Sequence, residues 1–97
     1  MKTVNILKKA GVFAENKDIA GEIRDRILLP TLGKNNEITL DFAGVEGATQ
    51  SFVHAVISEA IRRFGPEVLD HIVFRNCNDS IRAIIEIVVD YMQESGS

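Results

Sequence analysis

The side chains able to take part in acid–base or thiol chemistry are few in this chain of 97 residues. Asp41 lies near the end of an apolar run, Glu46 follows in a glycine-containing loop, and Cys77 comes after a second apolar run. Ligand sites of parallel sheets lie at the carboxyl ends of strands, so these three residues could line a small ligand-binding or enzymatic pocket. No His or Lys is placed in the sequence to complete an acid–base pair with Asp41. A structural role, hydrogen bonding between Asp41 and the following loop, is therefore the favoured interpretation.

Sequence motifs for metals and nucleotides are missing. The two histidines, His54 and His71, belong to no HxxxH pattern, and Cys77 belongs to no CxxC pattern, so we expect no metal site. Gly44 and Gly47 belong to neither a GxGxxG nor a GxxxxGK[ST] motif, so we expect them to shape backbone turns and expect no cofactor. A helix start near Cys77 could lower its pKa, but an inert loop thiol is the favoured interpretation.

Two hydroxyl side chains, Thr49 and Ser51, lie where a long apolar helix pattern begins. A side-chain oxygen at such a position satisfies backbone N–H groups that have no acceptor within the helix, so capping is the favoured role. Phosphorylation of Ser51 or Thr49 is the alternative. A phosphate would add about −1.5 to −2 charge at the positive end of the helix dipole.

Hydrophobic periodicity predicts strands that alternate with helices. Asn16 is a good N-cap for the first helix, Pro30 is expected to end it, and Gly65-Pro66 ends the second. Either Asn78 or Asp79 is expected to cap the last helix. The predicted strands span residues 3–7, 12–14, 37–42 and 71–75, and the predicted helices span residues 16–28, 49–64 and about 78–92.

This order of elements implies one small α/β domain over residues 1–97, with N-terminal strands in residues 1–15 and a mostly parallel or mixed sheet flanked by helices. The strand 71–75 should pair parallel to the central strand 37–42, and the tail 94–97 should fray. Apolar residues on the strand faces and helical stripes are expected to form the core: Phe42, Phe52, Val56, Ile57, Phe74, Ile84, Ile85 and Val88.

Composition excludes several classes of protein. The chain is 45% hydrophobic and carries a net charge of −3 with both signs scattered, so it should fold and offers no basic stripe for nucleic acid. The longest apolar stretch, residues 83–89, is interrupted by Glu86 and is too short for a membrane span. A lone Cys77 fits a reducing compartment. We therefore expect a cytoplasmic protein without nucleic-acid or membrane partners.

The segment ITLDFAGVEGATQSF at residues 38–52 resembles the bacterial STAS-like domains, relatives of the sulfate transporter and anti-sigma factor antagonist domains. In that family a strand ending in Leu-Asp-Phe-x-Gly-Val leads into a helix through a Ser- or Thr-rich turn followed by Ser-Phe. Residues 73–76, Val-Phe-Arg-Asn, are similar to the family's third strand and loop. The similarity extends over residues 37–92 and implies a small mixed sheet flanked by helices.

The resemblance implies a non-enzymatic regulatory module that resembles anti-sigma factor antagonists. Such domains dock a serine-kinase-like, GHKL-type ATPase, and phosphorylation of a hydroxyl at the helix entrance releases them. Here Gln50 aligns with the usual phospho-acceptor and Ser51 with the second hydroxyl. The loop and helix entrance at 46–51 would form the contact, together with the expected exposed side of the helix: Glu46, Gly47, Thr49, Gln50, Ser51, His54, Ser58 and Arg62.

Overall fold

A computed structural model of the chain describes residues 2–95. Its main sheet has three parallel strands in the order β1 (Lys2–Asn5), β3 (Ile38–Asp41), β5 (Ile72–Arg75). The register aligns Val4 with Leu40 and Leu40 with Phe74, so these side chains share one face of the sheet. The predicted α/β class and the parallel pairing of the last strand with the central strand are both confirmed.

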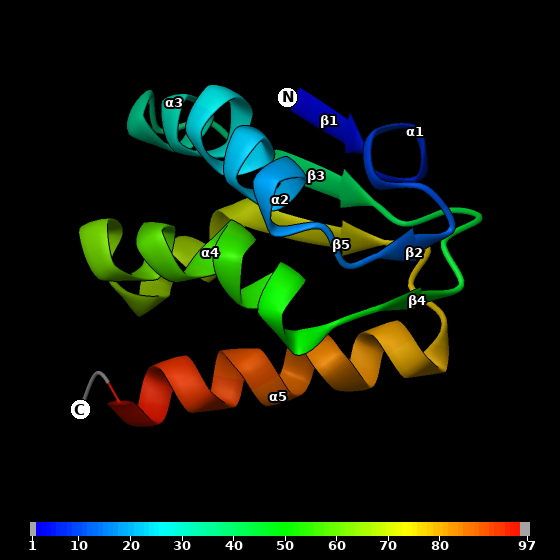
Figure 1. Cartoon of the computed structure of the whole chain (residues 1–97). Coiled ribbons are helices and arrows are strands. Elements are labelled where there is room, and N and C mark those ends of the chain that lie inside the picture. Colours follow the sequence, from blue (N-terminus) through cyan, green and yellow to red (C-terminus); the bar gives the residue numbers. More distant parts are fainter. Residues whose placement is uncertain (1, 96–97) are drawn as a thin grey trace.

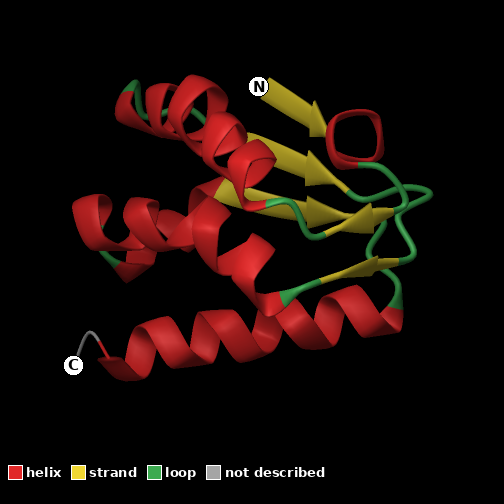
Figure 2. Ribbon diagram, in the orientation of Figure 1, coloured by secondary structure: helices red, strands yellow, loops and turns green. Residues whose placement is uncertain are grey.

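The helices lie between and after these strands (Figures 1 and 2). Figure 1 shows the long helix α4 between α2 and α5, with the three-stranded sheet behind α2 and α4. Among residues 2–95, no helix is both long and apolar enough to cross a membrane. The helical segments are α1 (Ile6–Ala10), α2 (Lys17–Ile23), the π-helical turn η1 (Arg24–Leu28), α3 (Leu29–Gly33), α4 (Gln50–Phe64), the 3-10 helix η2 (Pro66–His71) and α5 (Asp79–Ser95).

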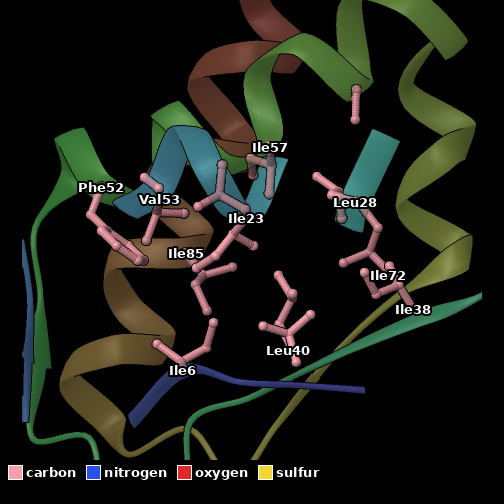
Figure 3. Packing of buried hydrophobic residues seen from close by; sticks show 14 of the residues in the cluster. Ile6, Ile23, Leu28, Ile38, Leu40, Phe52, Val53, Ile57, Ile72 and Ile85 are labelled. Atoms are coloured by element: carbon pink, nitrogen blue, oxygen red, sulfur yellow. The ribbon is translucent and has the colours of Figure 1, made fainter. Parts of the chain in front are cut away.

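The hydrophobic core lies between the sheet and the helices (Figure 3). Leu40 from the central strand meets Ile23 from α2 and Ile57 from α4 in the same buried cluster. Two of the expected core residues, Phe74 and Ile84, are only half-buried, because Phe74 lies on an edge strand and Ile84 flanks the buried stripe of α5. The other six are buried as predicted: Phe42, Phe52, Val56, Ile57, Ile85 and Val88.

The first predicted strand is shorter than expected. It ends at Asn5, whose side-chain oxygen accepts the backbone N–H of Lys8 at 3.0 Å and so caps the one-turn helix α1. The turn expected from Lys8 to Gly11 is therefore helical up to Ala10. The fraying expected of 94–97 lies outside the described residues except that α5 runs to Ser95.

The prediction that Pro30 ends the first long helix is wrong. Helical structure continues through η1 and α3 to Gly33, and Pro30 sits in the first turn of α3. A proline in a first helical turn loses little, because its missing N–H has no intrahelical acceptor there. The hydrogen-bond pattern changes in the wider π-helical turn just before it, and helical structure continues without a stop.

A second, two-stranded sheet joins the N-terminal segment to the entrance of α4. β2 (Phe13–Ala14), within the predicted strand 12–14, pairs in parallel with β4 (Gly47–Ala48), which lies in the segment expected to be a loop. A Cβ atom at Gly47 would lie 3.0 Å from the ring of Phe13, so glycine lets the two strands approach. Gly44 has φ +81°, the turn conformation expected of it.

Candidate functional site

The entrance of α4 is built by a capping threonine. Thr49 accepts the backbone N–H of Phe52 at 3.1 Å through its hydroxyl oxygen, and its own N–H donates to the carbonyl of Ala14 at 3.0 Å. The hydroxyl thus caps the helix, as predicted, and the backbone anchors the entrance to β2. Thr49 is half-buried in this arrangement.

The next two residues, Gln50 and Ser51, are exposed. They occupy the first two positions of the helix, whose N–H groups have no acceptor within it. The first turn of α4 contains no acidic side chain to offset the positive end of the helix dipole. The entrance therefore presents polar side chains and a partial positive charge to the surface.

A cavity of about 450 Å³ opens beside this entrance, between α4, the start of α2 and the middle of α5. The rings of His54 and Tyr91 are 6.3 Å apart at an angle of 59° across it. Ile87 and Tyr91 are 48% and 60% exposed, so two large apolar side chains lie together at the surface beside the cavity. The side chains that shape the cavity include Lys17, Gln50, Ser51, His54, Ile87 and Tyr91.

The cavity brings together three predicted site residues, Gln50, Ser51 and His54. His54, expected on the exposed side of the helix, is half-buried and lies against Tyr91. Sequence reasoning missed the contribution of α5. The signal was available, because Ile87 and Tyr91 are four residues apart and lie off the buried stripe of that helix.

Other predicted contact residues lie elsewhere. Ser58 is only 6% exposed, so its expected place on an exposed helix side is wrong. The reason is that α4 is packed on two flanks, by α2 and α5, as well as against the sheet. Gly47 is also buried. Glu46 is exposed in the loop before β4, where its backbone carbonyl accepts from the side chain of Asn78 at 2.9 Å.

In the alternative site around Asp41, Glu46 and Cys77, local hydrogen bonds hold the carboxylate of Asp41. Asp41 accepts from the side chain of Asn76 at 3.0 Å and from the backbone N–H of Ala43 at 2.9 Å. These bonds lower the pKa of Asp41, with Asn76 the larger cause. The predicted hydrogen bonding to the following loop is therefore confirmed.

Cys77 is half-buried, and burial raises the pKa of its thiol. The net direction is opposite to the lowering that a nearby helix start could have produced, which agrees with an inert thiol. The carboxylate of Asp41 thus holds the following loop through hydrogen bonds, and the thiol of Cys77 is partly shielded from solvent. Among the side chains that the structure describes, no group of three or more His, Cys, Asp or Glu residues could hold a metal ion.

A comparison with models of protein families gives a match. A family model described as a STAS-like domain of unknown function (DUF4325) matches residues 20–82, which is more than half of the 97-residue chain. The matched segment runs from α2 through the entrance of α4 and into the first turn of α5. Neither the curated proteins nor the solved structures contain a match to the chain.

Proposed function

Because this chain belongs to the family of STAS-like domains, we propose that it is a non-enzymatic regulatory module that binds a protein partner at the entrance of α4. The exposure of Gln50 and Ser51 beside a cavity with two exposed apolar side chains, Ile87 and Tyr91, carries this proposal. Exposed apolar groups rimmed by polar ones are typical of protein-binding surfaces.

The proposed partner is a GHKL-type, serine-kinase-like ATPase, as the resemblance to antagonist domains implies. Such a partner would transfer the γ-phosphoryl group of ATP to a hydroxyl at the entrance and release ADP. Gln50 has no hydroxyl to accept it. Ser51 is exposed, whereas Thr49 is half-buried and its hydroxyl oxygen accepts the N–H of Phe52. Ser51 is therefore the proposed acceptor, and Thr49 keeps its capping role.

Phosphorylation of Ser51 would change the entrance in two ways. The phosphate would be stabilised by the positive end of the α4 dipole and by Lys17, which shapes the same cavity. It would also repel an acidic partner surface and cost desolvation energy at an apolar one. Binding and release would then depend on one charge at one position.

The test is calorimetric binding of a GHKL-type ATPase encoded beside this protein. We expect Ser51→Asp to weaken binding about tenfold or more, because a carboxylate at the contact must be desolvated and repels acidic groups. Ser80→Asp is a matched control, since Ser80 is exposed at the same second position of α5. Equal binding by wild type and Ser51→Asp would refute the contact surface.

A second measurement addresses the modification. The protein is incubated with the ATPase and ATP, and the phosphorylated residue is located by mass spectrometry. Phosphate on Ser51, and its loss in Ser51→Ala, is the expected result. Phosphate confined to Thr49 or to a residue outside the entrance would overturn the assignment of Ser51.

A further inference from the structure

A second cavity, of about 570 Å³, continues along the same pair of helices. It shares His54 and Tyr91 with the first cavity and extends to Arg62 on α4 and Met92 on α5. We name the two cavities together the α4–α5 groove. The groove is thus longer than the helix entrance used in the proposed function.

The groove has the length of a short helix. Its lining on α4 runs from Gln50 to Arg62, which is about 18 Å at the helical rise of 1.5 Å per residue. That length accommodates about three turns of a partner helix. Both walls are helices, and a partner helix packs its ridges into such a groove.

The groove carries positive charge in an acidic protein. Lys17 lies at one end and Arg62 at the other, and no described Asp or Glu residue lines either cavity. The chain as a whole has a net charge of −3. Lys17 forms no ion pair with any described residue. The local sign is therefore opposite to that of the protein.

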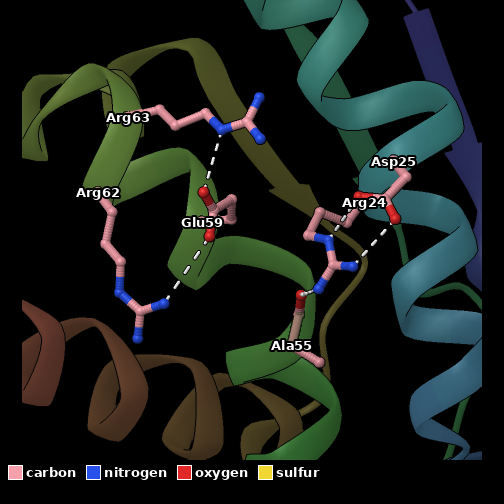
Figure 4. A network of polar contacts seen from close by, with 6 residues as sticks. All are labelled: Arg24, Asp25, Ala55, Glu59, Arg62 and Arg63. Carbon is pink, nitrogen blue, oxygen red and sulfur yellow. Dashed lines mark hydrogen bonds and ion pairs between the residues drawn. The ribbon is translucent and has the colours of Figure 1, made fainter.

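The positive charge of Arg62 is only weakly compensated by its ion pair with Glu59. Glu59 contacts two guanidinium groups, Arg63 at 3.0 Å and Arg62 at 3.8 Å (Figure 4). One carboxylate shared by two guanidinium groups leaves one positive charge without compensation. Arg62 is the more distant of the two and its side chain is 61% exposed, so solvent also weakens that ion pair.

We propose that the α4–α5 groove binds an acidic amphipathic helix of a partner protein. Apolar residues spaced i, i+3 or i+4, and i+7 on that helix would cover Ile87 and Tyr91. Carboxylates near its two ends would face Lys17 and Arg62. This inference rests on the proposed function in that the domain binds protein partners, but it does not depend on the partner being an ATPase.

The probes are two synthetic three-turn helical peptides with the same leucines at i, i+3, i+4 and i+7. One carries Glu at both ends and the other carries Lys. Binding to the full chain is measured by fluorescence anisotropy at low ionic strength, where screening is weakest. We expect the Glu peptide to bind about tenfold more tightly than the Lys peptide, with NMR shifts at Ile87 and Tyr91.

A charge exchange sharpens the test. In the double variant Lys17→Glu and Arg62→Glu the preference should reverse in favour of the Lys peptide, because both changed residues are exposed and the fold tolerates them. Lys34→Glu, in the exposed turn after α3, is the control and should leave the preference unchanged. Tyr91→Ala should weaken both peptides.

The outcomes separate this inference from the proposed function. Failure of both peptides to bind, equal binding of both, or an unchanged preference in the double variant would overturn the inference. Any of these results together with ATPase binding that is sensitive to Ser51→Asp would leave the proposed function standing. Preferential Glu-peptide binding without any binding of the ATPase would support the groove and reject the ATPase as partner.

Discussion

The entrances of α4 and α5 share the same type of side-chain cap but differ in their further hydrogen bonds and in charge. Thr49 and Asn78 each accept the N–H three residues on, at 3.1 and 2.8 Å. The Asn78 side chain also donates to the carbonyl of Glu46 at 2.9 Å, and Asp79 places a carboxylate in the first turn of α5. The α4 entrance has no acidic group in its first turn. The start of α5 is thus hydrogen-bonded to the loop before β4 and carries a carboxylate that offsets its helix dipole. The start of α4 is exposed and has no such carboxylate.

The largest expected effect tests what the two entrances share. Phe52 and Ile81 are the third residues of their helices, and both are buried. Phe52→Ala should lower the free energy of unfolding by about 3–5 kcal/mol and Ile81→Ala by about 2–5 kcal/mol, since each leaves a cavity in the core. Urea denaturation measures both. An unchanged stability of Phe52→Ala would mean that α4 is wrongly placed.

The caps themselves should differ. Asn78→Ala removes the cap of α5 and the bonds to the loop before β4, so we expect a loss of about 1–3 kcal/mol in unfolding free energy. Thr49→Ala removes a single capping bond and should cost about 0.5–2 kcal/mol. Asn78→Asp keeps the capping oxygen but not the donor, and should fall between wild type and Asn78→Ala. A larger loss for Thr49→Ala than for Asn78→Ala would break the comparison.

An added carboxylate should stabilise the α4 entrance more than the α5 entrance. Ser51→Asp supplies the first carboxylate of its turn and should raise the free energy of unfolding by about 0.3–1 kcal/mol at low salt. Ser80→Asp adds a second carboxylate beside Asp79 and should gain less. Thermal unfolding at low and high salt measures the difference, which should shrink as salt rises. Equal gains would show that the α4 dipole is already compensated.

The smallest effect concerns Asp41, whose bond to Asn76 fixes the loop that leads to α5. Its pKa is lowered on folding, so its contribution to stability is present above the unfolded pKa of about 3.9 and is lost as pH falls through the lower folded value. The stability difference between wild type and Asp41→Asn should be constant near neutral pH and shrink below about pH 4. A difference that grows on acidification would contradict this assignment.

Local signals in the sequence predicted much of the fold. The caps at Asn16, Thr49 and Asn78 were recognisable because a short polar side chain precedes each apolar stripe. The glycine at position 65 has φ +86° and ends α4 as expected. Pro30 was misread because its effect depends on where it lies in a helical turn, and a π-helical turn leaves no clear sequence signature.

The sequence predicted only the wall of the candidate site that comes from α4. Gln50, Ser51 and His54 follow one another along α4, so local reasoning found them. The opposite wall comes from α5, more than thirty residues later, and depends on how two helices pack. The prediction that Ser58 is exposed is wrong for the same reason. Its polarity suggested exposure, but packing on both flanks of α4 buries it.

The two-residue pairing of β2 with β4 gives the α4 entrance an opening equilibrium of its own. The hydrogen bonds from Glu46 and Thr49 to Val12 and Ala14 join segments more than thirty residues apart, and the ladder holds only two residue pairs. Such short ladders open at a lower free energy than the core strands. We therefore expect the amide hydrogens of Glu46 and Thr49 to exchange with solvent faster than those of β3, by local opening. The proposed binding surface would then open locally while the core stays folded.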